Sequence, residues 1–125
     1  MPHRPVEALG WGEAFAMAQG RIVEAPRRRL VLSGMGPFAA DPAAPGGVAL
    51  RHAGDPRAQL ALSLANLEAV LAAAGMARAD LVSLRVLTTD MDGFLAAEAT
   101  LLDWLRAGGA RPTRTLLGAA RLTEA

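Results

Sequence analysis

Residues 55–75 read DPRAQLALSLANLEAVLAAAG, and this segment carries the signals of a long amphipathic helix. Asp55 is a good N-cap residue, and Pro56 fits the first helical position, where the backbone needs no donor. Gly75 suits the C-terminal cap. Four leucines recur at helical spacing: Leu60, Leu64, Leu67 and Leu71. We therefore predict a helix over this segment that buries its leucine face.

A strand, a second helix and a last strand follow. Leu81 to Thr88 is apolar on both faces, which favours a central strand. Asp92 is the expected N-cap of the second helix, which should end at Gly108-Gly109. Its buried stripe would consist of Phe94, Leu101, Leu102 and Leu105. Thr113 to Leu122 then reads as the final strand.

The N-terminal half suggests strands and loops. Residues 15–23 and the apolar run 29–33 predict a hairpin, and residues 48–51 predict a brief strand. Between them, prolines and glycines make residues 37–47 an irregular loop. We expect about the first ten residues to be flexible. The order β-β-β-α-β-α-β implies a mixed sheet with two right-handed crossovers and both helices on one face.

Composition excludes several chemistries. All thirteen basic residues of this 125-residue chain are arginine, so lysine Schiff bases, lysine-anchored pyridoxal phosphate and Walker-type loops are ruled out. Cysteine is absent, which excludes disulfides, thiol nucleophiles and thiolate metal sites. His3 and His52 are too few for the usual zinc sites unless carboxylates or a second chain contribute. We expect no cofactor and no metal.

Size and polarity indicate one domain that self-associates. The chain is 52% hydrophobic, which is more than so small a core needs. This predicts an exposed apolar surface that favours self-association. A net charge of +1 does not indicate a protein that coats nucleic acid. The start does not resemble a signal peptide, and no apolar run approaches the roughly 20 residues that span a bilayer. We expect a cytoplasmic protein without a membrane partner.

Three local motifs have simpler explanations than function. Residues 34–39 fit a dinucleotide fingerprint, but the prolines that follow prevent the helix that would hold the pyrophosphate. Asp90 and Asp92 could suggest calcium, yet Leu101 stands where the bidentate acid should be. Arg27 to Arg29 lack aromatic neighbours for base stacking, so a charged hairpin tip explains them better than nucleic acid.

Single polar residues are less decisive. Ser33 and His52 lack a nucleophile-elbow context, and Asn66 is more often a solvent-facing or helix-pairing residue than a catalytic one. Arg114 lies in a strand that continues into apolar residues. Its guanidinium is therefore either exposed at an edge or held in a pocket for an anion.

Several fragments together resemble the RidA/YjgF/L-PSP family. They are Ser33-Gly34, Gly54-Asp55 with Gln59, the block Leu64 to Gly75, Leu87-Thr88-Thr89-Asp90-Met91, and Pro112-Thr113-Arg114-Thr115. Their order and spacing agree from about Phe15 to Leu122. The helix block and the Pro-x-Arg strand are the most specific.

The resemblance implies a chorismate-mutase-like α+β fold and a homotrimer with ligand clefts between subunits. It also implies hydrolysis of enamine/imine intermediates such as 2-aminoacrylate to a 2-oxo acid and ammonia. The arginine of the Pro-x-Arg strand, here Arg114, would grip the substrate carboxylate, and a planar bidentate donor suits that task. Ser33 and Gly34 would shape the cleft wall, and water would be the nucleophile.

The chain departs from the family pattern at positions that matter for chemistry. Met35 replaces the common Gln after Ser-Gly, and Phe15 replaces a Tyr. Glu98 aligns with an Asn, and Leu116 aligns with a Cys. The family continues past Arg121-Leu122 into a strand with a water-positioning Glu, whereas this sequence stops at Ala125.

Two further functions stay open. A trimeric protein that binds or senses small carboxylates without efficient catalysis is the main alternative. Ribonuclease or translation-inhibitor activity is a third, but the sequence offers no acid-base constellation for RNA cleavage. Glu98 is the only acid at an aligned site position, and it would repel a substrate carboxylate unless protonated or turned away.

Overall fold

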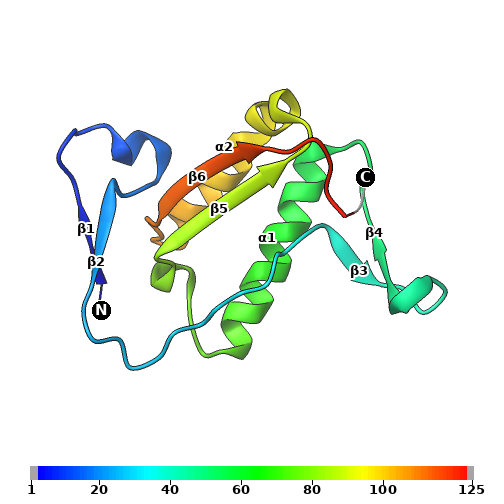
Figure 1. Cartoon of the computed structure of the whole chain (residues 1–125), viewed down its shortest axis with the longest axis horizontal. Helices are drawn as coiled ribbons and strands as arrows, with labels where there is room; N and C mark the ends of the chain where they lie inside the picture. The colour runs from blue at the N-terminus through cyan, green and yellow to red at the C-terminus, as the bar shows by residue number, and fades with distance from the viewer. Residues whose placement is uncertain (1–2, 124–125) are drawn as a thin grey trace.

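Two long helices and a parallel strand pair form the centre of the molecule (Figure 1). The computed structural model describes residues 3–123. The central elements are α1 (Pro56–Ala73), β5 (Ser83–Thr88), α2 (Met91–Ala107) and β6 (Thr113–Gly118). The short 3-10 turn η3 (Arg78–Asp80) connects α1 to β5. The fold is α+β, with β5 and β6 lying over the packed helices.

The prediction for α1 is confirmed. The Asp55 carboxylate accepts a hydrogen bond from the backbone N–H of Ala58 at 3.1 Å, and Pro56 opens the first turn. Beyond Ala73, Gly75 takes a left-handed φ of +70°, which lets the chain turn away at little conformational cost.

The start of α2 corrects the predicted cap. Asp90, not Asp92, precedes the helix, and its side chain accepts from the backbone N–H of Gly93 at 2.9 Å. Asp92 lies in the first turn, where a carboxylate still faces the positive end of the helix dipole. The helix ends at Ala107, followed by Gly108 and Gly109, as expected.

Strands β5 and β6 pair in parallel, with Leu84 opposite Arg114 and Val86 opposite Leu116. The inward positions of β5 are half-buried, and Ser83, Arg85 and Leu87 between them are exposed. Our prediction of a single mixed sheet is wrong for the isolated chain. Among residues 3–123 the six strands form three separate pairs. The outer face of β5 and β6 is left open.

The N-terminal unit, residues 3–23, differs from the predicted hairpin. Strand β2 (Gly20–Val23) lies within the predicted strand at 15–23, but it pairs antiparallel with β1 (His3–Val6) and not with residues 29–33, and the 3-10 turn η1 (Gly12–Phe15) lies between β1 and β2. Residues 29–33 form no strand. Leu30 and Leu32 pack on the helical core while Val31 is exposed, so the apolar alternation reflects burial rather than sheet pairing.

A second hairpin projects beside the N-terminal end of α1 (Figure 1). It joins β3 (Phe38–Ala40) to β4 (Val48–Leu50) through the 3-10 turn η2 (Pro45–Gly47). The predicted strand at 48–51 is therefore nearly right, but β3 lies inside the predicted loop. Asn66 on α1 anchors the hairpin by donating to the carbonyl oxygens of Gly36 and Phe38 at 2.9 and 3.0 Å.

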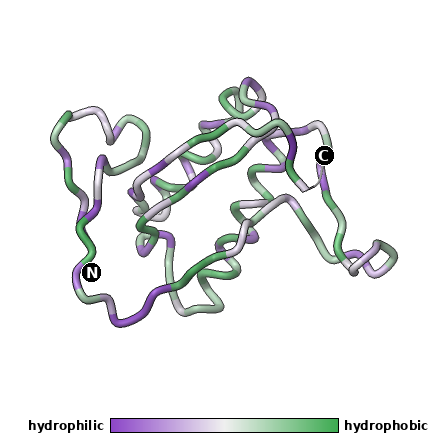
Figure 2. The backbone as a smooth tube through the Cα atoms, viewed as in Figure 1, coloured by the Kyte–Doolittle hydropathy of each residue, from purple (hydrophilic) through white to green (hydrophobic). Residues whose placement is uncertain are grey.

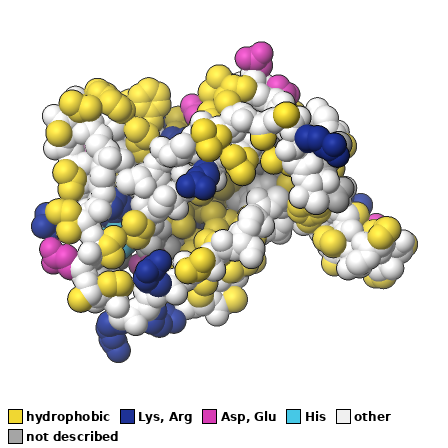
Figure 3. Space-filling model, viewed as in Figure 1, with side chains coloured by type: hydrophobic (Ala, Val, Ile, Leu, Met, Phe, Trp, Pro, Cys, Tyr) yellow, Lys and Arg dark blue, Asp and Glu magenta, His cyan; other side chains and the backbone are white. Residues whose placement is uncertain are grey.

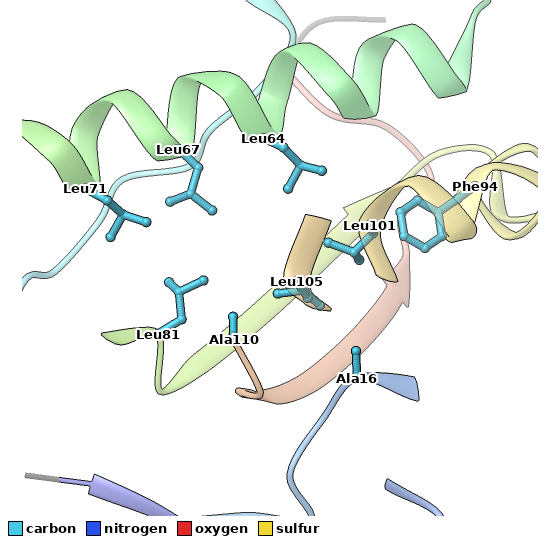
Figure 4. Packing of buried hydrophobic residues seen from close by; sticks show 9 residues of the cluster. All are labelled: Ala16, Leu64, Leu67, Leu71, Leu81, Phe94, Leu101, Leu105 and Ala110. Atoms are coloured by element: carbon cyan, nitrogen blue, oxygen red, sulfur yellow. The ribbon is translucent and has the colours of Figure 1, made fainter. Parts of the chain in front are cut away.

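The core lies between the helices and the strands. Leucines of α1 face residues of α2 and the connections around them (Figure 4). The buried cluster comprises Ala16, Leu64, Leu67, Leu71, Leu81, Phe94, Leu101, Leu105 and Ala110. The chain is hydrophilic around residues 27–29 and becomes hydrophobic where it reaches α1 (Figure 2). In residues 3–123, no helix is both long and apolar enough to cross a bilayer.

Candidate active site

Arginine side chains attach the N-terminal unit to the rest of the molecule. Arg21 donates to the carbonyl oxygen of Arg111 at 2.6 Å, and Arg111 donates to that of Met17 at 3.2 Å. Arg106 on α2 donates to the carbonyl oxygen of Ala14 at 2.9 Å. A guanidinium carries five donors, so it can satisfy carbonyls that a short turn leaves without partners.

A cleft of about 260 Å³ opens between this unit and the β6–α2 face. The turn between β1 and β2 contributes the aromatic and apolar wall, α2 contributes one acid, and β6 contributes the opposite wall. The lining residues are Trp11, Phe15, Met17, Glu98, Arg114, Thr115 and Leu116. Figure 3 shows hydrophobic side chains gathered over the N-terminal unit.

The aromatic wall depends on a tight turn. Trp11 and Phe15 stack edge to face, with ring centroids 6.4 Å apart and planes at 82°. A Cβ at Gly12 would lie 2.7 Å from the Met17 carbonyl oxygen, so the turn needs glycine there. Ala16 takes a left-handed φ of +48° and is buried. Both rings remain about half exposed, which leaves apolar surface for a ligand.

Arg114 is fixed in the cleft with unused hydrogen-bonding capacity. Its side chain is only 8% exposed. Nη1 donates to the carbonyl oxygen of Phe15, whereas the buried Nε has no hydrogen-bond partner within residues 3–123. A buried donor without an acceptor is unfavourable, so this guanidinium is suited to complete its hydrogen bonds with an anion.

Glu98 is the acid beside Arg114. Its Oε2 lies 3.4 Å from Nη2 of Arg114, longer than the 2.7–2.9 Å or so typical of a charge-assisted bond. The Glu98 side chain is 23% exposed, against 8% for its partner. Glu98 is therefore the more exposed partner of the pair, and Arg114 is the more buried one.

The predicted site residues divide into two groups. Phe15, Glu98, Arg114 and Leu116 come together in the cleft. Ser33 and Gly34 are exposed on the extended segment and do not line it, and Met35 packs against the core instead. Sequence reasoning missed Trp11, Met17 and Thr115. No local signal identifies the first two, because their position depends on how the N-terminal unit docks.

The other polar candidates lie elsewhere. His52 is exposed on the connection before α1, and Arg28 donates to the Ala74 carbonyl oxygen at the end of that helix. His3 is buried, and its Nδ1 accepts from Nε of Arg21 at 2.7 Å. Burial and then the charge of Arg21 lower the pKa of His3, with Asp80 opposing them. Residues 3–123 contain no group of three or more potential metal ligands.

Comparison with known proteins gives one family match. The model of the family described as Endoribonuclease L-PSP matches residues 16–125. A search of curated proteins finds no significant match.

Solved structures give clearer likenesses. The chain is 25% identical to YyfB of Yersinia pestis, a protein of unknown function in the conserved Rid family, with a TM-score of 0.80 over 99% of this chain and 90% of that one. The E. coli YjgF gene product is 28% identical, with a TM-score of 0.57 over 76% of this chain and 75% of that one. E. coli TdcF, solved with bound serine, is 25% identical, with a TM-score of 0.57 over 97% of this chain and 89% of that one.

Proposed function

Because the chain belongs to the RidA/L-PSP family, we propose that it hydrolyses reactive 2-imino acids of the 2-aminoacrylate type to 2-oxo acids and ammonia. Water attacks the carbon of the protonated imine, and the resulting tetrahedral adduct expels nitrogen as ammonium. The balance is one iminium acid and one water giving one 2-oxo acid and one ammonium ion. This reaction requires no cofactor.

The observation that carries the proposal is the state of Arg114. Its guanidinium is nearly buried and lines a cleft whose remaining wall is largely apolar, and among the described residues its Nε finds no acceptor. Desolvating an arginine is costly unless an anion compensates it. A substrate carboxylate that displaces Glu98 from Nη2 would reach the Nε–Nη2 edge and supply that anion with bidentate geometry.

Phe15 and Leu116 have a binding role in this proposal. Their apolar surfaces would hold the substrate side chain and limit the water that reaches the imine carbon. Ser33 and Gly34 keep the wall-shaping role only if they come from a neighbouring copy. We place the complete cleft between subunits of a homotrimer, with Ser33 and Gly34, both exposed in the single chain, on the adjoining wall.

The test is ammonia release from freshly generated 2-aminoacrylate, with the Arg114→Ala variant beside the wild type. We expect the wild type to accelerate release and the variant to fall to background. Arg114→Lys should recover only part of the rate because the bidentate geometry is lost. Arg27→Ala is the matched control, because Arg27 is exposed and lies outside both the cleft and the outer face of β5 and β6. Release that is unaffected by Arg114→Ala would refute the proposal.

A catalytically weak carboxylate-binding protein is the second candidate. The observation that favours it is Glu98, which lies beside Arg114 and competes for the guanidinium. Under this alternative, 2-oxo acids would raise the melting temperature in an Arg114-dependent way without ammonia release. RNA cleavage has less support, since neither His3 nor His52 lines the cleft. We propose no nucleic-acid partner.

A further inference from the structure

We infer that Glu98 recognises the nitrogen of the ligand, so that the cleft prefers a zwitterion, with a cationic nitrogen next to its carboxylate, over a simple carboxylate or 2-oxo acid. This inference rests on the proposed function, because it names the substrate form that the same cleft selects. It assigns to Glu98 a specificity role.

The charges in the cleft are paired before any ligand binds. Arg114 and Glu98 lie 3.4 Å apart and cancel formally, and the other lining residues are uncharged. A ligand with one net negative charge would bring a second carboxylate next to Glu98. That arrangement is repulsive, and screening is reduced where side chains are half-buried.

A zwitterion removes the conflict. Its carboxylate can occupy the Nε–Nη2 edge of Arg114 while its nitrogen, attached to the adjacent carbon, lies between that carboxylate and Glu98. Charges then alternate from the guanidinium to the acid. Glu98 accepts no other hydrogen bond within residues 3–123, so its oxygens have capacity for an N–H donor.

The unequal burial of the two side chains supports the same assignment. Arg114 is held by the Phe15 carbonyl oxygen and is nearly buried, so it stays in place. Glu98 is more exposed and its contact is long, so it can move aside to admit the ligand carboxylate and then accept from the nitrogen.

The arrangement also distinguishes substrate from product. An iminium acid carries the cationic nitrogen, whereas the 2-oxo acid formed from it has lost that charge. Glu98 therefore attracts the reactive form and repels the product, which favours release. The apolar wall adds a preference for an aliphatic side chain on the ligand.

The experiment compares two ligands that differ at one group. Calorimetric titration of the wild-type protein at pH 7 with L-norvaline and with 2-oxopentanoate measures the preference for nitrogen with the propyl chain kept constant. We expect L-norvaline to bind tighter, on the order of tenfold, the size of one hydrogen bond to a charged group. Glu98→Gln should abolish the preference. Asp103→Asn, which removes an exposed acid from the same helix, should retain it.

Glu98→Ala provides a second variant without the carboxylate if Glu98→Gln unfolds. Equal binding of both ligands to the wild type, or an undiminished preference in both Glu98 variants, would overturn the inference. If ammonia release still depends on Arg114 in that case, the proposed function stands and only the role of Glu98 is wrong. If the wild type binds neither ligand and releases no ammonia, the proposed function and the role of Glu98 are both wrong.

Discussion

Individual arginines perform tasks in this molecule that lysine could not. Arg78 pairs with Glu68 through two hydrogen bonds while its guanidinium lies 4.5 Å from the ring centre of Trp104. Arg111 contacts a backbone carbonyl and the Glu7 carboxylate. A planar group with several fixed donors can join segments distant in sequence, whereas an ammonium offers a single point charge.

His3 makes the N-terminal unit sensitive to acid. Its pKa in the folded protein is lowered from the ordinary value of 6.5, chiefly by burial and then by Arg21. The unfolded chain therefore binds more protons as the pH falls below about 6.5. The contribution of neutral His3 to the free energy of unfolding is fully present above pH 6.5. It is lost as the pH falls through 6.5 toward the pKa of His3 in the folded protein.

We expect His3→Asn, which keeps an acceptor near Nδ1, to reduce the loss of stability between pH 7.5 and 5.5. Urea denaturation at both pH values measures the change in the free energy of unfolding. His52→Asn is the control, since His52 is exposed, and it should keep the wild-type dependence. An unchanged dependence in His3→Asn would assign the acid sensitivity to other groups.

At the scale of elements, both helices and the strands β5 and β6 follow from local signals, whereas the pairing of strands does not. Caps and leucine spacing are read within a few residues, which is why α1 is predicted almost to its ends and α2 to within a residue or two. Strand pairing depends on distant partners. Residues 29–33 show the alternation of a strand, yet they pack on helices without a ladder.

The cleft shows the same limit. Arg114, Glu98 and Leu116 could be grouped from the family pattern because they lie on β6 and α2, which are fixed by the core. Trp11 and Met17 could not, because arginine contacts across the chain determine where their turn lies.

The cap of α2 gives an element-scale prediction. Asp90→Ala should lower the free energy of unfolding by about 1 kcal/mol, because the backbone N–H of Gly93 loses its acceptor. Asp92→Ala should lower the free energy of unfolding by only a few tenths of a kcal/mol, since that side chain makes no cap and contributes through the helix dipole. Urea denaturation separates the two. Equal losses, or a larger loss for Asp92→Ala, would restore Asp92 as the cap.

At the scale of the whole molecule, the outer face of β5 and β6 exposes apolar side chains that a monomer would be expected to bury. Leu87 is 50% exposed and Leu117 is 45% exposed, on strands that pair in register. Side by side, such leucines favour association with another surface. This face is where we expect copies of the chain to meet.

We predict a closed trimer, and sedimentation equilibrium should return about three times the 13.0 kDa chain mass at micromolar concentration. Leu117→Glu should shift the mass toward the monomer while helical circular dichroism is retained. Leu95→Glu, at a residue exposed to 51% on α2, is the control and should remain trimeric. A stable wild-type monomer would remove both the trimer and the inter-subunit cleft.

The attachment of the N-terminal turn has a consequence for substitutions in the cleft wall. Arg106, Arg111 and Arg114 hold it by its main-chain carbonyl oxygens, which every amino acid provides. Phe15 and Met17 can therefore be exchanged for other residues without loss of the acceptors that fix the turn. Substitutions at these two positions would therefore change the wall of the cleft and leave the backbone contacts of the turn in place.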